Sequence, residues 1–204
     1  MKHPSSRELF AHWTERRADR AAPERIDIEP GAIRKALGDT FVLAPDATGE
    51  FVFRLAGTGV CALFGRELRN IAFTAIWHGR DRAAIREGLA EVGGETVAMV
   101  ASASARTVEG FRSELECLLL PLRHRGRPHQ RMIGVLAPLA PPPWLGASRI
   151  ETLDLAGIRV IDVADRAVPT PDLATAGSRD TALSRTTQSA HKKSCIPPVV
   201  GSAV

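Results

Sequence analysis

Apolar and polar residues alternate over several short runs of the chain, as they do in β-strands with one buried face. Two runs, 40–43 and 50–56, flank residues 45–49, whose proline, aspartate and glycine favour a turn. These two runs therefore predict a hairpin. Three more strands are predicted at 96–104, 111–122 and 130–138. Short glycine-containing turns separate these three, which is typical of an antiparallel meander.

The N-terminal part of the chain has the spacing of helices. A helix is predicted over 6–17, beginning after a capping box of Ser5 and Glu8. Its narrow apolar stripe consists of Leu9, Phe10 and Trp13. A second short helix is predicted from Pro30 to a stop at Gly38. The apolar face of this second helix is formed by Ile33 and Leu37.

Helical spacing returns between the hairpin and the meander, over 60–68 and 81–92. Beyond the meander, the three prolines at 141–143 exclude the interior of a sheet or helix. The apolar stretch 153–163 is expected to be a strand or a packed edge segment. Further on the composition shifts to Ser, Thr, Ala and Pro, which is typical of disorder. The predicted organisation is 5–38 N-terminal helices, 39–162 core and 163–204 disordered tail.

Length, net charge and cysteine content exclude some classes of function and favour others. The 204 residues, 44% of them hydrophobic, suffice for one well-buried core. The net charge of +4 is too small for a protein that binds duplex nucleic acid through a focused basic surface. The three cysteines, Cys61, Cys117 and Cys195, are far apart and are expected to be reduced thiols. No window reaches the ~18 apolar residues of a membrane helix, and no signal peptide precedes the first helix, so we expect a cytoplasmic protein.

The chain contains one motif that resembles a dinucleotide-binding fingerprint, Gly57-x-Gly59-x-x-Ala62 after the strand 50–56. The strand argues against this interpretation, because Arg54 lies on one of its faces, whereas a parallel strand is covered on both. The acidic residue near the required distance, Asp81, opens a helix instead of ending a strand. A nucleotide-binding protein or oxidoreductase built on this turn therefore remains the alternative.

The sequence lacks the common catalytic motifs, so we expect a protein without enzymatic activity. The sequence has no Gly-x-Ser-x-Gly elbow, no His-Glu-x-x-His and no Walker loop. His78 next to Trp77 is compatible with a haem ligand, but a lone histidine in a turn is more often a surface residue. The cofactor is therefore unknown, and no metal site is predicted. A nucleic-acid binder using the tail residues 191–193 is a third class of function, which predicts salt-sensitive binding.

The order of the elements resembles a PAS domain. Several segments resemble one branch, the small stand-alone alphaproteobacterial PAS proteins formerly classed as a family of unknown function. The segments that carry the resemblance are Leu9-Phe10-Ala-His-Trp13, 20–25, 33–34, 53–58, 61–69, 137–141 and Trp144-Leu145-Gly146. The most specific is Gly65-Arg66-Glu67-Leu68. Two departures stand out. Asn70 replaces a usual glycine but tolerates left-handed backbone, and Pro143 replaces an aromatic residue.

The resemblance implies an α+β fold, a five-stranded antiparallel sheet with a helical middle segment across one face and N-terminal helices. PAS domains either bind a ligand between sheet and helices or fill that space with side chains. The candidate ligand-binding residues are Phe53, Cys61, Phe64, Arg66, Phe73 and Trp77. Three of them, Phe64, Phe73 and Trp77, are better explained as ordinary core, because a helix that packs on a sheet must bury such groups anyway. Arg66 with Glu67 is equally compatible with a turn-stabilising pair, and Glu114 and Glu116 mark where their strand face passes from solvent into the core.

The resemblance also implies a way of signalling. PAS domains use the outer sheet face and the N-terminal helix for dimers or partners, so the expected contact residues are Leu9, Phe10 and Trp13. We expect no effector domain beside the core, so any output would pass through association. We therefore expect a non-catalytic sensor or regulatory module of bacterial signalling. It would act by sensing a small molecule or by associating with a signalling protein or a second copy.

Overall fold

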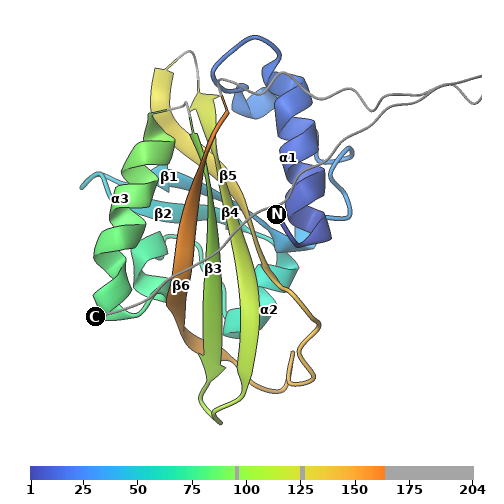
Figure 1. The fold of residues 1–204 in the computed structure, drawn as a ribbon, viewed down its shortest axis with the longest axis vertical. Helices are drawn as coiled ribbons and strands as arrows, with labels where there is room; N and C mark the ends of the chain where they lie inside the picture. The colour runs from blue at the N-terminus through green and yellow to red at the C-terminus, as the bar shows by residue number, and fades with distance from the viewer. Residues whose placement is uncertain (95–96, 125–126, 164–204) are drawn as a thin grey trace, which may run out of the picture. The chain divides into compact units, whose positions relative to one another are not determined.

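Within residues 1–94, 97–124 and 127–163, the part of the chain that this computed structural model describes, six strands form one sheet (Figure 1). Their order is β2-β1-β5-β4-β3-β6, and every neighbouring pair is antiparallel. The strands are β1 Thr40–Pro45, β2 Phe51–Ala56, β3 Val97–Thr107, β4 Arg112–His124, β5 Arg127–Pro138 and β6 Ile150–Asp162. The predicted α+β class with an antiparallel sheet is confirmed.

The sheet has one strand more than the five predicted. The stretch 153–163, expected to be a strand or an edge segment, belongs to β6, which pairs with β3 at the end of the sheet. Leu153 is fully buried and Leu155 is partly buried against the same core, which gives this strand an apolar face. The sixth strand therefore extends the buried surface of the sheet beyond β3.

Three α-helices lie on the two faces of the sheet, α1 Pro4–Arg17, α2 Thr58–Phe64 and α3 Arg82–Gly93. Short 3-10 helices occupy η1 Arg25–Asp27, η2 Leu37–Asp39, η3 Phe73–Ile76 and η4 Gly79–Asp81. Helices α1 and α3 lie on opposite sides of the sheet (Figure 1). No helix among the described residues is both long and apolar enough to span a bilayer.

The start of α1 differs from the prediction. The helix begins at Pro4, whose fixed φ suits the first helical position, and the His3 ring Nδ1 accepts a hydrogen bond from the Ser5 N–H at 3.2 Å. The Ser5 hydroxyl donates to Asp39 Oδ2 at 2.7 Å. The predicted capping box of Ser5 and Glu8 is therefore wrong, because Ser5 lies inside the first turn and ties the helix to η2.

The prediction of a second N-terminal helix, from Pro30 to Gly38, is wrong as well. Residues 30–36 form consecutive turns, with hydrogen bonds of 3.3 Å from Ile33 N to Pro30 O and 2.9 Å from Ala36 N to Ile33 O. These bonds span three residues instead of the four of an α-helix. Ile33 is buried, whereas Leu37 is 38% exposed, so the two side chains do not share one apolar face.

A β-bulge changes which face β2 presents. Leu43 pairs with Phe53 and Val42 pairs with Leu55, so Arg54 has no partner in the register. The extra residue turns Leu55 to the opposite face, where it is 48% exposed. Phe53 and Leu55 therefore do not share a face, as they would in a regularly alternating strand, although Arg54 is exposed as expected.

The two faces of the sheet carry separate apolar cores. The inner core packs the sheet against α2, η3 and α3, and includes Phe41, Phe53, Phe64, Phe73, Trp77 and Leu89. The outer core packs the sheet against α1 and the turns after it, and includes Leu9, Trp13, Ile33, Val42, Leu118 and Val135. The predicted tail 163–204 lies outside the described residues except for Val163, which belongs to the outer core.

Candidate ligand-binding site

Three of the predicted ligand-binding residues form the centre of the inner core. Phe53, Phe73 and Trp77 are fully buried, and their rings pack against each other and against Phe41. Ring centroids are 5.4 Å apart for Phe41 and Phe53, 5.7 Å for Phe53 and Phe73, and 6.0 Å for Phe73 and Trp77. These separations are those of favourable aromatic contacts. The four rings therefore fill the space between the sheet and η3.

Cys61 lies apart from this ring cluster, half-buried on α2. Its Sγ donates to Ala56 O and to Glu67 Oε2, both at 3.8 Å. Burial, aided by the Glu67 charge, raises the pKa of the Cys61 thiol. Burial also raises the pKa of Cys117. Both shifts are opposite to the lowered pKa that is typical of nucleophilic cysteines. Cys195 lies outside the described residues.

The remaining two predicted residues lie at a surface hollow of about 280 Å³. Phe64 is buried in the inner core but contributes to the wall, and Arg66 is an exposed wall residue. The other wall residues are Arg149, Ile150 and Glu151. We call this hollow the arginine hollow. The structure thus separates the six predicted residues into a filled interior, a half-buried cysteine and a surface site.

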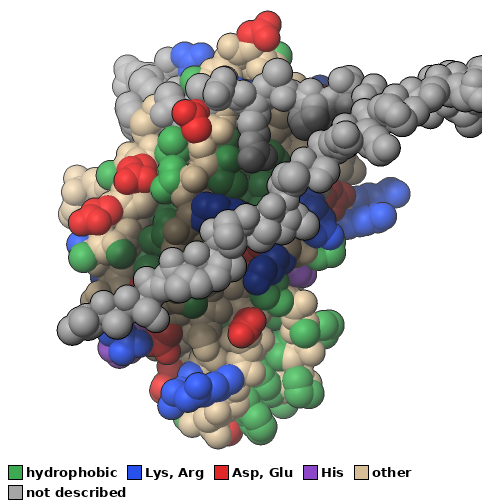
Figure 2. Space-filling view, in the orientation of Figure 1, with side chains coloured by type: hydrophobic (Ala, Val, Ile, Leu, Met, Phe, Trp, Pro, Cys, Tyr) green, Lys and Arg blue, Asp and Glu red, His purple; other side chains and the backbone are tan. Residues whose placement is uncertain are grey.

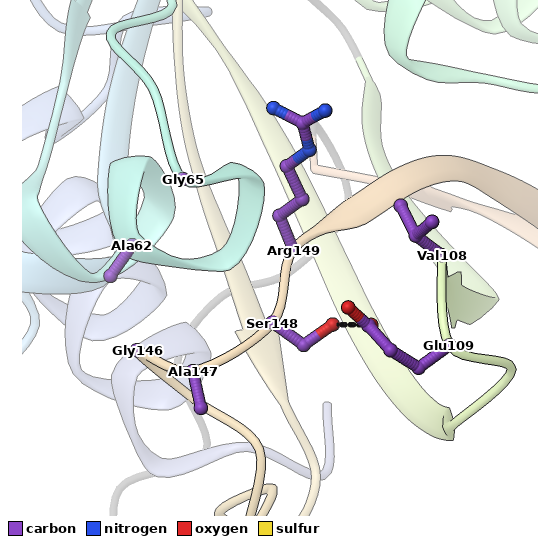
Figure 3. Close-up of a pocket in the computed structure, with 8 residues that line it drawn as sticks. All are labelled: Ala62, Gly65, Val108, Glu109, Gly146, Ala147, Ser148 and Arg149. Carbon is purple, nitrogen blue, oxygen red and sulfur yellow. Dashed lines mark hydrogen bonds between the residues drawn. The ribbon is translucent and has the colours of Figure 1, made fainter.

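A second hollow of about 350 Å³ adjoins the first at Arg149 (Figure 3). We call it the turn hollow, because the β3–β4 turn and the segment before β6 form most of its wall. Its wall residues are Ala62, Gly65, Val108, Glu109, Gly146, Ala147, Ser148 and Arg149. The Ser148 hydroxyl donates to Glu109 Oε2, and this bond lowers the pKa of the Glu109 carboxyl. The Arg149 side chain extends away from the Ser148–Glu109 pair (Figure 3).

Backbone conformation brings Arg149 next to α2. Gly65 ends that helix with φ +59°, a left-handed conformation that favours glycine. A Cβ at Gly65 would lie 3.2 Å from Arg149 Cβ, so the two chain segments are in close contact. Trp144, 5% exposed, anchors the segment before β6 in the inner core. Further along, Asn70 adopts φ +64°, which confirms that its backbone is left-handed.

The geometry around Gly57 and Gly59 explains these glycines without a nucleotide. A Cβ at Gly57 would lie 2.3 Å from Leu37 O and 2.4 Å from Gly38 O, and one at Gly59 would lie 2.9 Å from Gly38 O. The backbone of η2 therefore occupies the space next to both glycines. The preceding strand is antiparallel, and Asp81 accepts a hydrogen bond from Leu155 N at 2.9 Å. The features expected of a dinucleotide site are not present at this turn.

Two of the predicted contact residues are internal. Leu9 and Trp13 are fully buried in the outer core, and Trp13 Nε1 donates to Pro121 O at 2.8 Å. Phe10 is partly exposed and its ring stacks on Trp13, with centroids 6.3 Å apart. Of the three residues, Phe10 is thus the one that reaches solvent.

Glu116 binds the N-terminal segment, a role that its local sequence does not indicate. This side chain is 4% exposed, and its carboxylate accepts hydrogen bonds from Lys2 N at 2.6 Å and His3 N at 3.0 Å. Burial by itself would raise the pKa of Glu116, but the two N–H donors, Ser6 and the charge of the N-terminus together outweigh it, so the pKa is lowered. Glu114 is exposed, so the predicted passage of this strand face from solvent into the core is confirmed.

Arg149 was also missed, because nothing in its local sequence distinguishes it from other exposed arginines. The predicted pair of Arg66 and Glu67 does not form an ion pair, although both side chains are described. His78 is exposed, as expected for a surface histidine. Within the described ranges, no group of three or more His, Cys, Asp and Glu side chains could hold a metal ion.

Comparisons with solved structures give distant matches. An RNA-binding Light-Oxygen-Voltage receptor has 20% identity and a TM-score of 0.40, covering 54% of this chain and 33% of its own. The dark structure of the blue-light photoreceptor Aureochrome1 LOV has 14% identity and a TM-score of 0.41, covering 54% and 81%. A PAS domain from Colwellia psychrerythraea has 12% identity and a TM-score of 0.38, covering 52% and 92%.

Sequence comparison is more informative. No curated protein matches this chain. A family model described as PAS domain matches residues 1–137, which is more than half of the 204 residues. The match includes α1, the hairpin, the helical middle and most of β5. The chain therefore belongs to the PAS domain family.

Proposed function

We propose that this PAS domain is a non-catalytic regulatory module that acts in the cytoplasm by associating with a second copy or with a signalling protein. The observation that carries the proposal is the contrast between a filled interior and a partly exposed aromatic residue on α1. The rings of Phe41, Phe53, Phe73 and Trp77 are buried and pack against one another in the space where a ligand would have to lie inside the domain. Phe10 lies on the opposite side of the sheet and reaches solvent.

The outer surface supports self-association through α1. Phe10 packs against the outer core on one side and stacks on Trp13, so its exposed part is held in a fixed orientation. A rigid aromatic side chain costs little entropy when it enters an interface. The buried Leu9 and Trp13 support Phe10 from below and take no direct part in the proposed contact.

Sedimentation velocity over a range of concentrations tests this proposal. We expect a reversible dimer for the unmodified chain. Phe10→Glu is expected to weaken the dimer at least tenfold, because it places a charge in the apolar contact. Ala83→Glu, an equal charge change at an exposed position of α3, is the matched control and should leave association unchanged. A monomer at every concentration, or an unchanged dimer in Phe10→Glu, contradicts self-association.

The sensing of a small molecule is a second candidate function, favoured by the two adjoining hollows at Arg149. These hollows lie outside the ring cluster, so a ligand there does not need to displace the aromatic core. This placement makes the surface site the better candidate for sensing than the interior.

A further inference from the structure

Two arginines line the arginine hollow, and they come from segments far apart in the chain. Arg66 follows the end of α2, and Arg149 immediately precedes β6. Within the described part of the chain, neither guanidinium group makes a hydrogen bond or ion pair with another residue; the Arg66 backbone N–H donates to Cys61 O at 3.2 Å. Arg149 acts on Glu109 through its charge, while the Glu109 carboxylate is bonded to Ser148. The donors of both guanidinium groups are therefore available to a ligand.

Guanidinium groups match the geometry of carboxylate and phosphate. Each presents a rigid fork of N–H donors that can bind two oxygens at once, and such charge-assisted bonds are stronger than neutral ones. Glu151 also lines the arginine hollow, so its three charged wall residues, Arg66, Arg149 and Glu151, sum to +1. The wall is thus complementary to an anion of low charge.

The same walls provide apolar surface beside the arginines. Phe64 and Ile150 contribute to the arginine hollow, and both belong to the inner core. Val108, 55% exposed, and Ala62 line the turn hollow on the other side of Arg149. Apolar side chains also gather at the lower right of the space-filling view, over the end of the domain where the segment between β5 and β6 runs (Figure 2). A ligand that combines an anionic and an apolar part fits this surface better than a simple inorganic ion.

We propose that the arginine hollow binds a small organic anion, a carboxylate or phosphate monoester with an apolar group, through Arg66 and Arg149. Volumes of about 280 and 350 Å³ suit a small molecule. This inference deepens the proposed sensing role. The contact between Arg149 and Gly65 links the ligand to the end of α2, and Phe64 continues that link into the inner core.

Isothermal titration with phenyl phosphate tests the proposal, with benzoate as a second probe that distinguishes a phosphate from a carboxylate head group. We expect saturable binding of at least one probe. Inorganic phosphate, which lacks the apolar group, and benzyl alcohol, which lacks the charge, should both bind more weakly. Arg66→Gln and Arg149→Gln are each expected to lower the affinity for the probe about tenfold or more. Arg86→Gln, on the exposed face of α3, is the matched control.

Glu151→Gln gives a change in the opposite direction. Removing this carboxylate removes a like charge from the wall, so the anionic probe should bind more tightly and the difference should shrink at high salt. The proposal is overturned if neither probe shows saturable binding. It is also overturned if the Arg66→Gln and Arg149→Gln variants bind the probe as tightly as the unmodified chain does. Titration of the Phe10→Glu variant separates this result from the association test, because the arginine hollow does not include α1 and should keep its affinity in a monomer.

Discussion

The two faces of the sheet are stabilised in different ways. On the inner face, four aromatic rings pack together with α2, η3 and α3 through apolar contact. On the outer face, the smaller apolar core under α1 is supplemented by specific hydrogen bonds. These bonds join Glu116 to Lys2 N and His3 N, Ser5 to Asp39, and Trp13 to Pro121 O.

The difference predicts different responses to disturbance. Apolar packing is spread over many contacts, so the inner core should be lost only when the whole domain unfolds. The N-terminal end of α1 depends on a few polar contacts at the edge of the domain, so it should open at a lower free energy. A regulatory contact on α1 could therefore change without any disturbance of the ring cluster.

The largest expected effect is on the inner face. Phe73→Ala removes a fully buried ring that contacts Phe41, Phe53 and Trp77. We expect the free energy of unfolding to fall by about 3–5 kcal/mol, because the substitution leaves a cavity that the packed neighbours cannot fill. Urea denaturation measures this change. Phe111→Ala, at a 52% exposed position, is the control, and an equal loss there would contradict the proposed role of the ring cluster.

An intermediate effect is expected at the centre of the outer core. Trp13→Phe keeps an aromatic ring but removes the Nε1 donor and leaves the Pro121 carbonyl without its 2.8 Å hydrogen bond. The expected loss is roughly 1–3 kcal/mol, the cost of an unsatisfied buried acceptor together with a small cavity. Glu15→Gln, on the exposed side of the same helix, should change stability little. A Trp13→Phe variant as stable as the parent would show that packing alone holds α1.

The smallest effect is expected at the N-terminal segment. Glu116→Gln removes the charge that strengthens the bonds from Lys2 N and His3 N, at a cost of about 1 kcal/mol. Because the pKa of Glu116 is lower in the folded chain, its contribution is complete above the ordinary carboxyl value of 4.5 and is lost as pH falls through the lowered folded value. The stability difference between parent and variant should therefore shrink with acid.

Amide hydrogen exchange at the first turn of α1 measures this contribution locally. Faster exchange is expected there in Glu116→Gln at neutral pH, with unchanged exchange in the inner strands. Glu114→Gln, exposed on the same strand, is the control. A Glu116→Gln effect that stays constant from neutral pH to well below 4.5 would show that the carboxylate charge plays no part.

Much of the fold follows from local pattern. The bounds of β2, α1 and α3 agree with the predictions to within a few residues, since alternating or helical spacing of apolar residues reflects which face each element buries. The hairpin turn was readable for a local reason too, because Asp46 Oδ1 accepts from the N–H groups of Thr48 and Glu50. The left-handed Asn70 follows the same logic.

The errors have tertiary causes. Leu55 changes face because a bulge in pairing with β1 inserts one residue, and no pattern within β2 itself indicates that insertion. Ser5 bonds to Asp39, 34 positions away, in place of capping its own helix. The pair Gly57 and Gly59 matched a nucleotide motif, but the tertiary contact with η2 is what requires two residues without side chains.

The sequence by itself determined the antiparallel sheet, the helical middle and the apolar stripe of α1, because each depends on the periodic burial of neighbouring residues. Tertiary structure decided the packing of the aromatic rings, the attachment of the N-terminus to Glu116 and the placement of Arg66 and Arg149 in the wall of one hollow. Each of these joins residues from distant segments, and their proximity depends on how the strands pair and how the helices pack, which local spacing does not encode.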